Sequence, residues 1–215
     1  MKTISLQEAV ALIPNGASLM IGGFMGVGSP ERVLDELVRQ GRRNLTVIAN
    51  DTAIPGRGIG KLVSAGLVAK TIASHIGLNP ETQKQMIDGK MEVDLVPQGT
   101  LIERIRAGGY GLGGVLTPTG VGTVVEDGKQ QIEVDGKAYL LEKALRADFA
   151  LVHAFLADYI GNLAYALTAR NFNPVIAMAA DKVIATAENI VPVGVISPDQ
   201  VVTPAPLVDY LVAHE

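Results

Sequence analysis

A glycine-rich loop is the first place where this sequence has residues suited to chemistry. Residues 22–30 read Gly-Gly-Phe-Met-Gly-Val-Gly-Ser-Pro and separate an apolar run from a helical pattern. Backbone N–H groups in such a loop, with the positive end of the following helix, bind phosphate or carboxylate groups. A tight turn whose glycines adopt positive φ explains the same residues. Both interpretations stay open for the candidate binding residues Gly22, Gly23, Phe24, Met25, Gly26, Val27 and Gly28.

Several common catalytic and cofactor signatures are missing from the sequence. The position three after Gly28 is Glu31, which removes the dinucleotide-binding fingerprint. No Gly-Lys pair precedes Ser or Thr, and no Gly-x-Ser-x-Gly elbow occurs. The histidines, His75, His153 and His214, have no zinc-type spacing. We therefore expect no metal site, no permanently bound cofactor, and structural or surface roles for the histidines.

The elements around the loop predict an α/β fold with a mostly parallel sheet flanked by helices. Apolar runs at residues 18–23, 45–50, 69–74 and 91–96 read as strands, and helical patterns follow at 30–41, 80–88 and 101–106. Parallel crossovers collect the loops at the carboxyl ends of the strands, where α/β folds bind ligands. The three candidate segments there are residues 22–29, 50–60 and 98–99.

The second half of the chain departs from this alternation. Residues 108–122 predict a long irregular segment, and residues 131–141 predict a β-hairpin because Asp135-Gly136 suits a two-residue turn. Residues 149–154 and 182–187 read as late strands, and residues 207–212 as a short terminal helix. The hairpin is thus expected to be an excursion from the main sheet.

Composition limits the class of protein. A chain of 215 residues with 48% hydrophobic and 19% charged residues fits one domain, residues 1–215. A net charge of −4 with scattered basic residues argues against nucleic acid as a partner. The absence of cysteine excludes disulfides and a cysteine nucleophile. No secretory signal is visible, and the uncharged stretch at residues 9–30 is interrupted by glycines and prolines, so we expect a cytoplasmic chain without membrane contact.

Residues 15–30 resemble the first signature of family I CoA-transferases. The shared pattern is Asn-Gly-x-x-Leu-Met-Ile-Gly-Gly-Phe-x-x-x-Gly-x-Pro, and the likeness continues at residues 50–52, 96–101, 104–109, 117–123 and 169–174. The resemblance implies a fold like that of ribose-5-phosphate isomerases. It also implies the role of the smaller alpha subunit, paired with a beta subunit of related fold, in an α2β2 assembly.

Family membership would also imply a mechanism. In this family a glutamate in a Glu-Asn-Gly motif of the second subunit attacks acyl-CoA, and a glutamyl-CoA thioester forms in ping-pong catalysis. This chain has no such triplet, and its nearest counterpart, Glu188-Asn189-Ile190, is expected to be a surface feature after a strand. Coenzyme A would be a substrate and not a resident cofactor.

Two amide side chains are the catalytic candidates, Asn50 from the resemblance and Gln98 from its position in the sequence. Asn50 matches the family position that donates to the developing oxyanion, although an Asx-turn would explain the same residue. Gln98 lies at a similar strand end beside Gly99 and would orient the acyl group or the attacking carboxylate. Replacing Gly26 or Gly28 with Val is expected to weaken acyl-CoA binding more than folding.

Substrates and rival functions complete the expectations. Residues 49–53 and 74–82 resemble transferases for acetate, butyrate and acetoacetate more than succinate-dependent ones. The orientation of Arg57, the single basic residue of the second glycine-rich loop, stays open. A catalytically silent module that binds CoA or a small anion is the alternative function. A sugar-phosphate isomerase is disfavoured because no paired carboxylates stand at the strand ends.

Overall fold

The computed structural model describes residues 1–213. Its main sheet has nine strands, eight of them in the order β1-β12-β11-β9-β2-β3-β4-β5, all parallel, with short β10 antiparallel to β9. The strands are β1 Lys2–Ile4, β2 Ser18–Ile21, β3 Leu45–Asp51, β4 Val68–His75, β5 Glu92–Leu95, β9 Ala147–Asp158, β10 Leu163–Ala164, β11 Ala180–Val191 and β12 Tyr210–Val212. The expected mostly parallel sheet is confirmed.

Six α-helices and four 3-10 turns connect the strands. They are α1 Leu6–Ala11, α2 Glu31–Gln40, α3 Gly60–Ser64, α4 Pro80–Ile87, α5 Gln98–Gly109, α6 Asn173–Ile176, η1 Val124–Glu126, η2 Leu167–Arg170, η3 Pro198–Gln200 and η4 Ala205–Leu207. Local signals fix several of their ends. The side chains of Ser5 and Glu8 form a capping box at α1, Asn79 caps α4, and Gly41 ends α2 with φ 65. No helix within residues 1–213 is long and apolar enough to cross a membrane.

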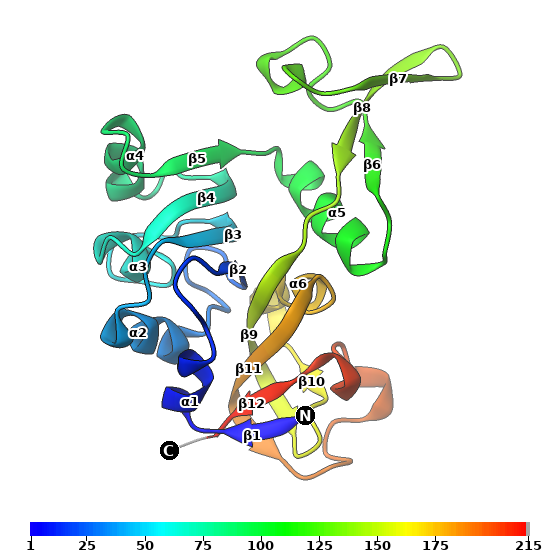
Figure 1. Ribbon diagram of the computed structural model, residues 1–215. Coiled ribbons are helices and arrows are strands. Elements are labelled where there is room, and N and C mark those ends of the chain that lie inside the picture. The colour runs from blue at the N-terminus through cyan, green and yellow to red at the C-terminus, as the bar shows by residue number, and fades with distance from the viewer. Residues whose placement is uncertain (214–215) are drawn as a thin grey trace.

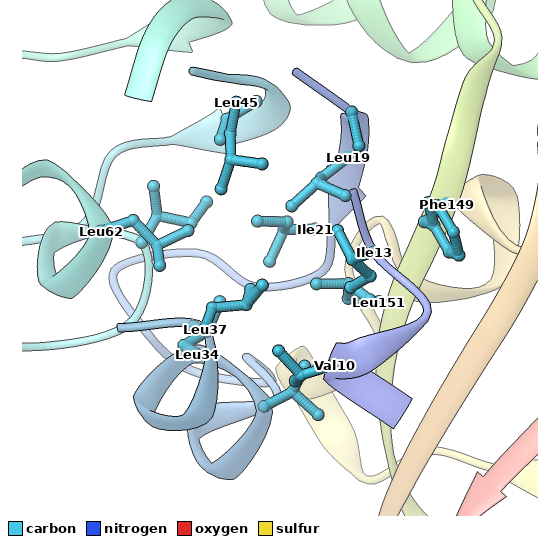
Figure 2. Close-up of a cluster of buried hydrophobic side chains, with 14 of the residues drawn as sticks. Val10, Ile13, Leu19, Ile21, Leu34, Leu37, Leu45, Leu62, Phe149 and Leu151 are labelled. Carbon is cyan, nitrogen blue, oxygen red and sulfur yellow. The ribbon is translucent and has the colours of Figure 1, made fainter. Parts of the chain in front are cut away.

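Helices cover both faces of the main sheet (Figure 1). Helices α1 to α4 lie along one face, and α5 and α6 lie on the other. The first face packs a core that includes Leu19, Ile21, Leu34, Leu37 and Leu151 (Figure 2). The opposite face packs a second core around residues such as Met20, Ile48 and Leu101. Burial on two faces explains why the central strands read as continuous apolar runs.

A small three-stranded sheet projects from the main body, at the upper right of Figure 1. Its order is β6-β8-β7, from β6 Gly114–Thr117, β7 Gln131–Val134 and β8 Lys137–Lys143. The predicted hairpin is confirmed, because Asp135 and Gly136 both adopt positive φ, 51 and 73. The expectation of a wholly irregular segment at 108–122 was wrong, since β6 pairs antiparallel with β8.

Other boundaries also differ from the sequence-based expectation. Residues 210–212 form β12, which lies between β1 and β11, so the predicted terminal helix at 207–212 was wrong. The helix expected at 101–106 extends over Gln98–Gly109, and both late strands reach twelve residues. Strands β9 and β11 are longer than the central strands and continue beyond the end of β2. Helix α6 therefore packs near the carboxyl end of β2.

Candidate active site

The carboxyl ends of β2, β3 and β4 lie at one edge of the main sheet. The register pairs Met20 with Ile48 and Asp51 with His75, so the glycine-rich loop, Asn50 and the end of β4 are neighbours. Val96 donates its N–H to the carbonyl of Ala73, which brings the start of α5 to the same edge. The candidate segments that the sequence placed at strand ends are therefore brought together.

Asn50 and Gln98 contact each other directly. Nε2 of Gln98 donates to Oδ1 of Asn50 at 2.7 Å, and Oγ of Ser74 donates to the backbone carbonyl of Asn50 at 2.7 Å. Asn50 is only 2% exposed, yet its Nδ2 makes no hydrogen bond within residues 1–213. Two side-chain atoms in that range are fully enclosed and have no hydrogen-bond partner, Arg42 Nε and Thr100 Oγ1. Nδ2 of Asn50 is not one of them, so it is not fully enclosed. The arrangement thus offers a fixed, neutral donor with an unused N–H at a strand end.

Asp51, the next residue, fixes the glycine-rich loop from one side. Its carboxylate accepts the N–H of Met25 at 3.0 Å. Burial raises the pKa of the Asp51 carboxyl, and the N–H groups of Met25 and Ala53 offset part of that effect. Sequence analysis included Asp51 in the matching residues 50–52 but assigned it no role.

The tip of the glycine-rich loop is a two-residue turn. Phe24 and Val27 exchange backbone hydrogen bonds of 3.0 and 2.9 Å across Met25 and Gly26, whose φ angles are 52 and 82. The left-handed conformation costs a non-glycine residue about 1–2 kcal/mol, and the bond from Met25 to Asp51 opposes that cost. The side chains of Phe24, Met25 and Val27 remain about 40% exposed, so the tip is an apolar surface at the candidate site.

Most N–H groups of this loop already have acceptors. Those of residues 22, 23, 24, 25, 27 and 29 donate within the protein, and only Gly26 and Gly28 lack an acceptor within residues 1–213. The first residue of α2, Glu31, accepts the N–H of Gly58 at 2.9 Å and contacts Lys61 at 2.6 Å. A carboxylate therefore already lies in the first turn of α2. At most two N–H groups of the loop are therefore left for an anion, and the other N–H groups hold the loop in place within the protein.

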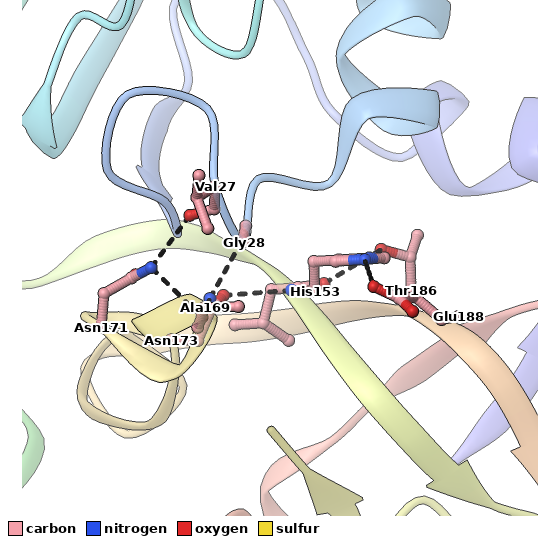
Figure 3. A network of polar contacts seen from close by, with 9 residues as sticks. Val27, Gly28, His153, Ala169, Asn171, Asn173, Thr186 and Glu188 are labelled. Atoms are coloured by element: carbon pink, nitrogen blue, oxygen red, sulfur yellow. Dashed lines mark hydrogen bonds and ion pairs between the residues drawn. The ribbon is translucent and has the colours of Figure 1, made fainter. Parts of the chain in front are cut away.

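Two asparagines fix the loop from the other side (Figure 3). Asn171 accepts the N–H of Gly23 at 3.0 Å and donates to the carbonyl of Val27 at 3.0 Å. Asn173, fully buried, donates to the carbonyl of Gly28 at 3.0 Å and accepts the N–H of His153 at 3.0 Å. Sequence analysis included both in residues 169–174 but assigned them no function.

Close approach explains two glycines of the loop. A Cβ at Gly22 would lie 1.9 Å from Oδ1 of Asn173, and one at Gly28 would lie 2.4 Å from the carbonyl oxygen of Ala169. A Cβ at Gly26 would lie 2.8 Å from the side chain of Arg57. The orientation of Arg57 that the sequence left open is therefore toward the tip of the glycine-rich loop.

The histidines lie in different settings. His153 is half-buried, with Nδ1 2.9 Å from Oγ1 of Thr186 and Nε2 3.9 Å from the exposed carboxylate of Glu188 (Figure 3). Burial lowers the pKa of His153, and Glu188 opposes that shift. Glu188 lies within β11 and not after a strand as expected. His75 is exposed, and His214 lies outside the described residues. Within residues 1–213 no cluster of three or more metal-ligating side chains occurs.

A cavity of about 420 Å³ opens beside the first turn of α5. Gly99, Thr100 and Glu103 of α5 line one wall, and β6 with Thr119 lines the other. The projecting sheet therefore faces the first turn of α5, which begins at Gln98.

Comparison with known proteins identifies the family of this chain. A model of the family "Coenzyme A transferase" matches residues 3–214. The chain belongs to the coenzyme A transferase family. It is 54% identical to the acetate CoA-transferase subunit alpha of Escherichia coli K12, over 100% of this chain and 97% of that protein. It is 48% identical to the acetoacetyl-CoA:acetate/butyrate CoA transferase alpha subunit of Clostridium acetobutylicum, over 98% of this chain and 97% of that protein.

Solved structures of coenzyme A transferases share the fold. A thioester complex of an acyl-CoA transferase from E. coli O157:H7 with CoA superposes with a TM-score of 0.87 at 27% identity, over 99% of this chain and 47% of that one. This chain thus spans about half the length of that protein. The decarboxylase AibA/AibB superposes with a TM-score of 0.83 at 30% identity, over 99% of this chain and 82% of the decarboxylase chain. The expected fold class is confirmed, and the fold alone does not choose the reaction.

Proposed function

We propose that this chain is the alpha subunit of a coenzyme A transferase whose active site is completed by a beta subunit. The observation that carries the proposal is the Asn50 amide, which is buried at the end of β3 and has an unused N–H. A fixed donor in a buried site stabilises negative charge that develops beside it. The alpha subunits that are 54% and 48% identical support the same assignment.

In the proposed reaction the nucleophile comes from the beta subunit. Its glutamate attacks the acyl-CoA carbonyl, and the C–S bond breaks to give an acyl-glutamyl anhydride and CoA thiolate. The thiolate then attacks the glutamyl carbonyl and releases the first carboxylate, which leaves a glutamyl-CoA thioester. The acceptor carboxylate repeats these steps in reverse order, so that CoA leaves on the acceptor and the glutamate is regenerated.

Asn50 supplies the electrostatic part of this chemistry. Each attack on the glutamyl carbonyl converts its oxygen into an oxyanion, to which Nδ2 of Asn50 would donate. A neutral amide suits this task, because it stabilises the adduct without introducing a charge beside the attacking glutamate. The N–H groups of Gly26 and Gly28 lack an acceptor, and that of the half-buried Gly28 is the better placed to bind an anionic group of the substrate, because Gly26 is buried against Arg57. The apolar side chains of Phe24, Met25 and Val27 would line the same entrance.

We infer that the acids transferred are acetate, butyrate or acetoacetate. The names of the two alpha-subunit relatives support this choice, and both exceed the 40–46% identity of the succinyl-CoA:3-ketoacid relatives. A dicarboxylate would favour an additional cation in the pocket. Arg57 lies against Gly26 at the tip of the loop, so a substrate panel must include succinate.

Reconstitution tests the proposed function. We expect the isolated chain to lack CoA-transferase activity and to gain it when mixed with a partner that contains Glu-Asn-Gly, because that triplet is missing here. The assay should include acetate, butyrate, acetoacetate and succinate as acceptors, and sedimentation should show two copies of each subunit. Full turnover by the isolated chain, or decarboxylation without CoA transfer by the pair, contradicts the proposal.

The alternative is a catalytically silent module that binds CoA or a small anion. Such a module would bind CoA in a titration without a partner and would form no stable complex with a Glu-Asn-Gly protein. The same reconstitution therefore separates the two functions.

A further inference from the structure

The orientation of the Asn50 amide depends on a single neighbour. A primary amide has one accepting end and one donating end, and the two have nearly the same shape. The backbone of Asn50 is fixed by β3 and by the bond from Ser74, which leaves the direction of the side-chain amide to be set. Within residues 1–213 the only hydrogen bond to that amide comes from Nε2 of Gln98, at 2.7 Å.

The geometry points to Gln98 as a positioning residue that makes the N–H of Asn50, and not its carbonyl, face the reacting oxygen. In the orientation that the structure shows, the NH₂ group of Gln98 donates, so Oδ1 of Asn50 faces Gln98. Gln98 is a primary amide too, so the reversed bond, from Nδ2 of Asn50 to Oε1 of Gln98, would require both side chains to turn together. Nδ2 then faces away, toward the position without an acceptor. This inference rests on the proposed function, and it differs from the sequence-based role in which Gln98 contacts the acyl group or nucleophile.

The position of Gln98 suits this task. It is the first residue of α5, directly after Pro97, and the helix behind it packs Leu101 and Ile105 into the core. The helix therefore fixes the Gln98 backbone while the side chain extends to Asn50. Removing the donor would let the Asn50 amide rotate, whereas a carboxylate at this position would bind Nδ2 of Asn50 and hold the amide in the reversed orientation.

Two substitutions at Gln98 separate these cases in the reconstituted pair. Gln98→Met keeps the length and removes the hydrogen bond, and we expect kcat to fall roughly two- to tenfold, the effect of one neutral hydrogen bond. Gln98→Glu should lower kcat by roughly a hundredfold, close to the effect of Asn50→Ala, because the donor is turned away. KM for acyl-CoA should change little in both. Gln130→Glu, at an exposed position directly before β7, is the matched control for one added charge.

A pH profile gives a readout that loss of structure would not produce. A protonated Glu at position 98 again donates to Oδ1 of Asn50, so the kcat of Gln98→Glu relative to the unmodified pair should rise as the pH falls from 7 toward 5. The same ratio for Gln130→Glu should stay flat. If the kcat ratio of Gln98→Glu to the unmodified pair does not change with pH, the carboxylate does not reverse the Asn50 amide.

A double-mutant cycle with Asn50→Ala decides whether Gln98 acts through Asn50. If it does, adding Gln98→Met or Gln98→Glu to Asn50→Ala should change kcat by less than about twofold. A further loss equal to that in the unmodified background means that Gln98 contacts the substrate itself or acts through charge, and overturns the inference. No effect of Gln98→Met in the unmodified pair overturns it as well. An inactive unmodified pair would instead refute the proposed function, and a neutron diffraction structure of the Gln98→Glu variant, which locates the amide hydrogens, would then still show which end of the Asn50 amide faces position 98.

Discussion

At the scale of residues, Asn50 combines a buried side chain with an N–H₂ group that has no hydrogen-bond acceptor within residues 1–213. The side chain is buried, but Nδ2 is not fully enclosed, so this donor can reach a group outside the chain. Here the carbonyl end of the side chain is bound and the N–H₂ end is not. An Asx-turn, the structural alternative for Asn50, would use its side-chain oxygen on a nearby backbone N–H, and that oxygen instead accepts from Gln98.

Replacing Asn50 tests this assignment. We expect Asn50→Ala to lower kcat of the reconstituted pair by roughly a hundred- to a thousandfold with little change in acyl-CoA affinity, as for other single oxyanion donors. Asn50→Asp should be at least as damaging, because it adds like-charge repulsion to the lost hydrogen bond. Steady-state kinetics and sedimentation of each variant check the effect and the assembly. Near-normal turnover in an assembled Asn50→Ala enzyme contradicts the role.

At the scale of elements, the glycine-rich loop is fixed on both sides by groups distant in sequence. Asp51 binds one side, and Asn171 and Asn173 bind the other. A loop with these contacts has little freedom to close on a ligand, so it acts as a preorganised wall of the site. The structure therefore changes one expectation, since replacing Gly28 should damage folding before it affects binding.

Three glycines with nearly the same φ separate strain from steric overlap. The φ angles of Gly56, Gly26 and Gly28 are 75, 82 and 80. A Cβ at Gly56 would contact nothing, one at Gly26 would contact the flexible Arg57 side chain, and one at Gly28 would contact the carbonyl of Ala169. Each Ala substitution adds about 1–2 kcal/mol of left-handed strain, which lowers Tm by roughly 2–8 °C in a chain of this size. We expect Gly28→Ala to lower Tm clearly more than Gly56→Ala does. Gly26→Ala should lower Tm about as much as Gly56→Ala, because the Arg57 side chain can move. Equal shifts in thermal melts would show that the contact with Ala169 has no energetic effect.

Local sequence patterns were sufficient for some elements and not for others. The strands from β2 to β5 and helices α2 and α4 follow from apolar runs and end signals within a few residues. Strand β12 does not, because Tyr210–Val212 becomes a strand only by lying between β1 and β11. The same limit applies to the site. Asn50 lies at the end of β3 and Gln98 follows β5, and both were predicted to share an edge. By contrast, Asn171 contacts Gly23 across 148 positions of sequence that no local pattern connects.

At the scale of the whole molecule, one edge of the sheet carries both the unused donor and an exposed apolar surface. Phe24, Met25 and Val27 are each about 40% exposed at the tip of the glycine-rich loop, and Ile54, on the loop after β3, is 37% exposed. If the glutamate of a beta subunit reaches Asn50, that subunit must cover this edge. Apolar side chains at the centre of an interface commonly contribute most of the binding energy.

Substitution of Phe24 tests whether the partner covers this tip. We expect Phe24→Asp to weaken association with the beta subunit at least about tenfold, because burial would desolvate the introduced charge. Ile87→Asp is the matched control, since Ile87 is 78% exposed and ends α4 at the opposite edge of the sheet. Titration of labelled alpha subunit with beta subunit measures both affinities, and thermal melts of the isolated chains check folding. Unchanged association of Phe24→Asp with a raised KM for acyl-CoA would place the substrate, and not the partner, against the tip. Equal weakening by Ile87→Asp would show that the added charge acts without regard to position.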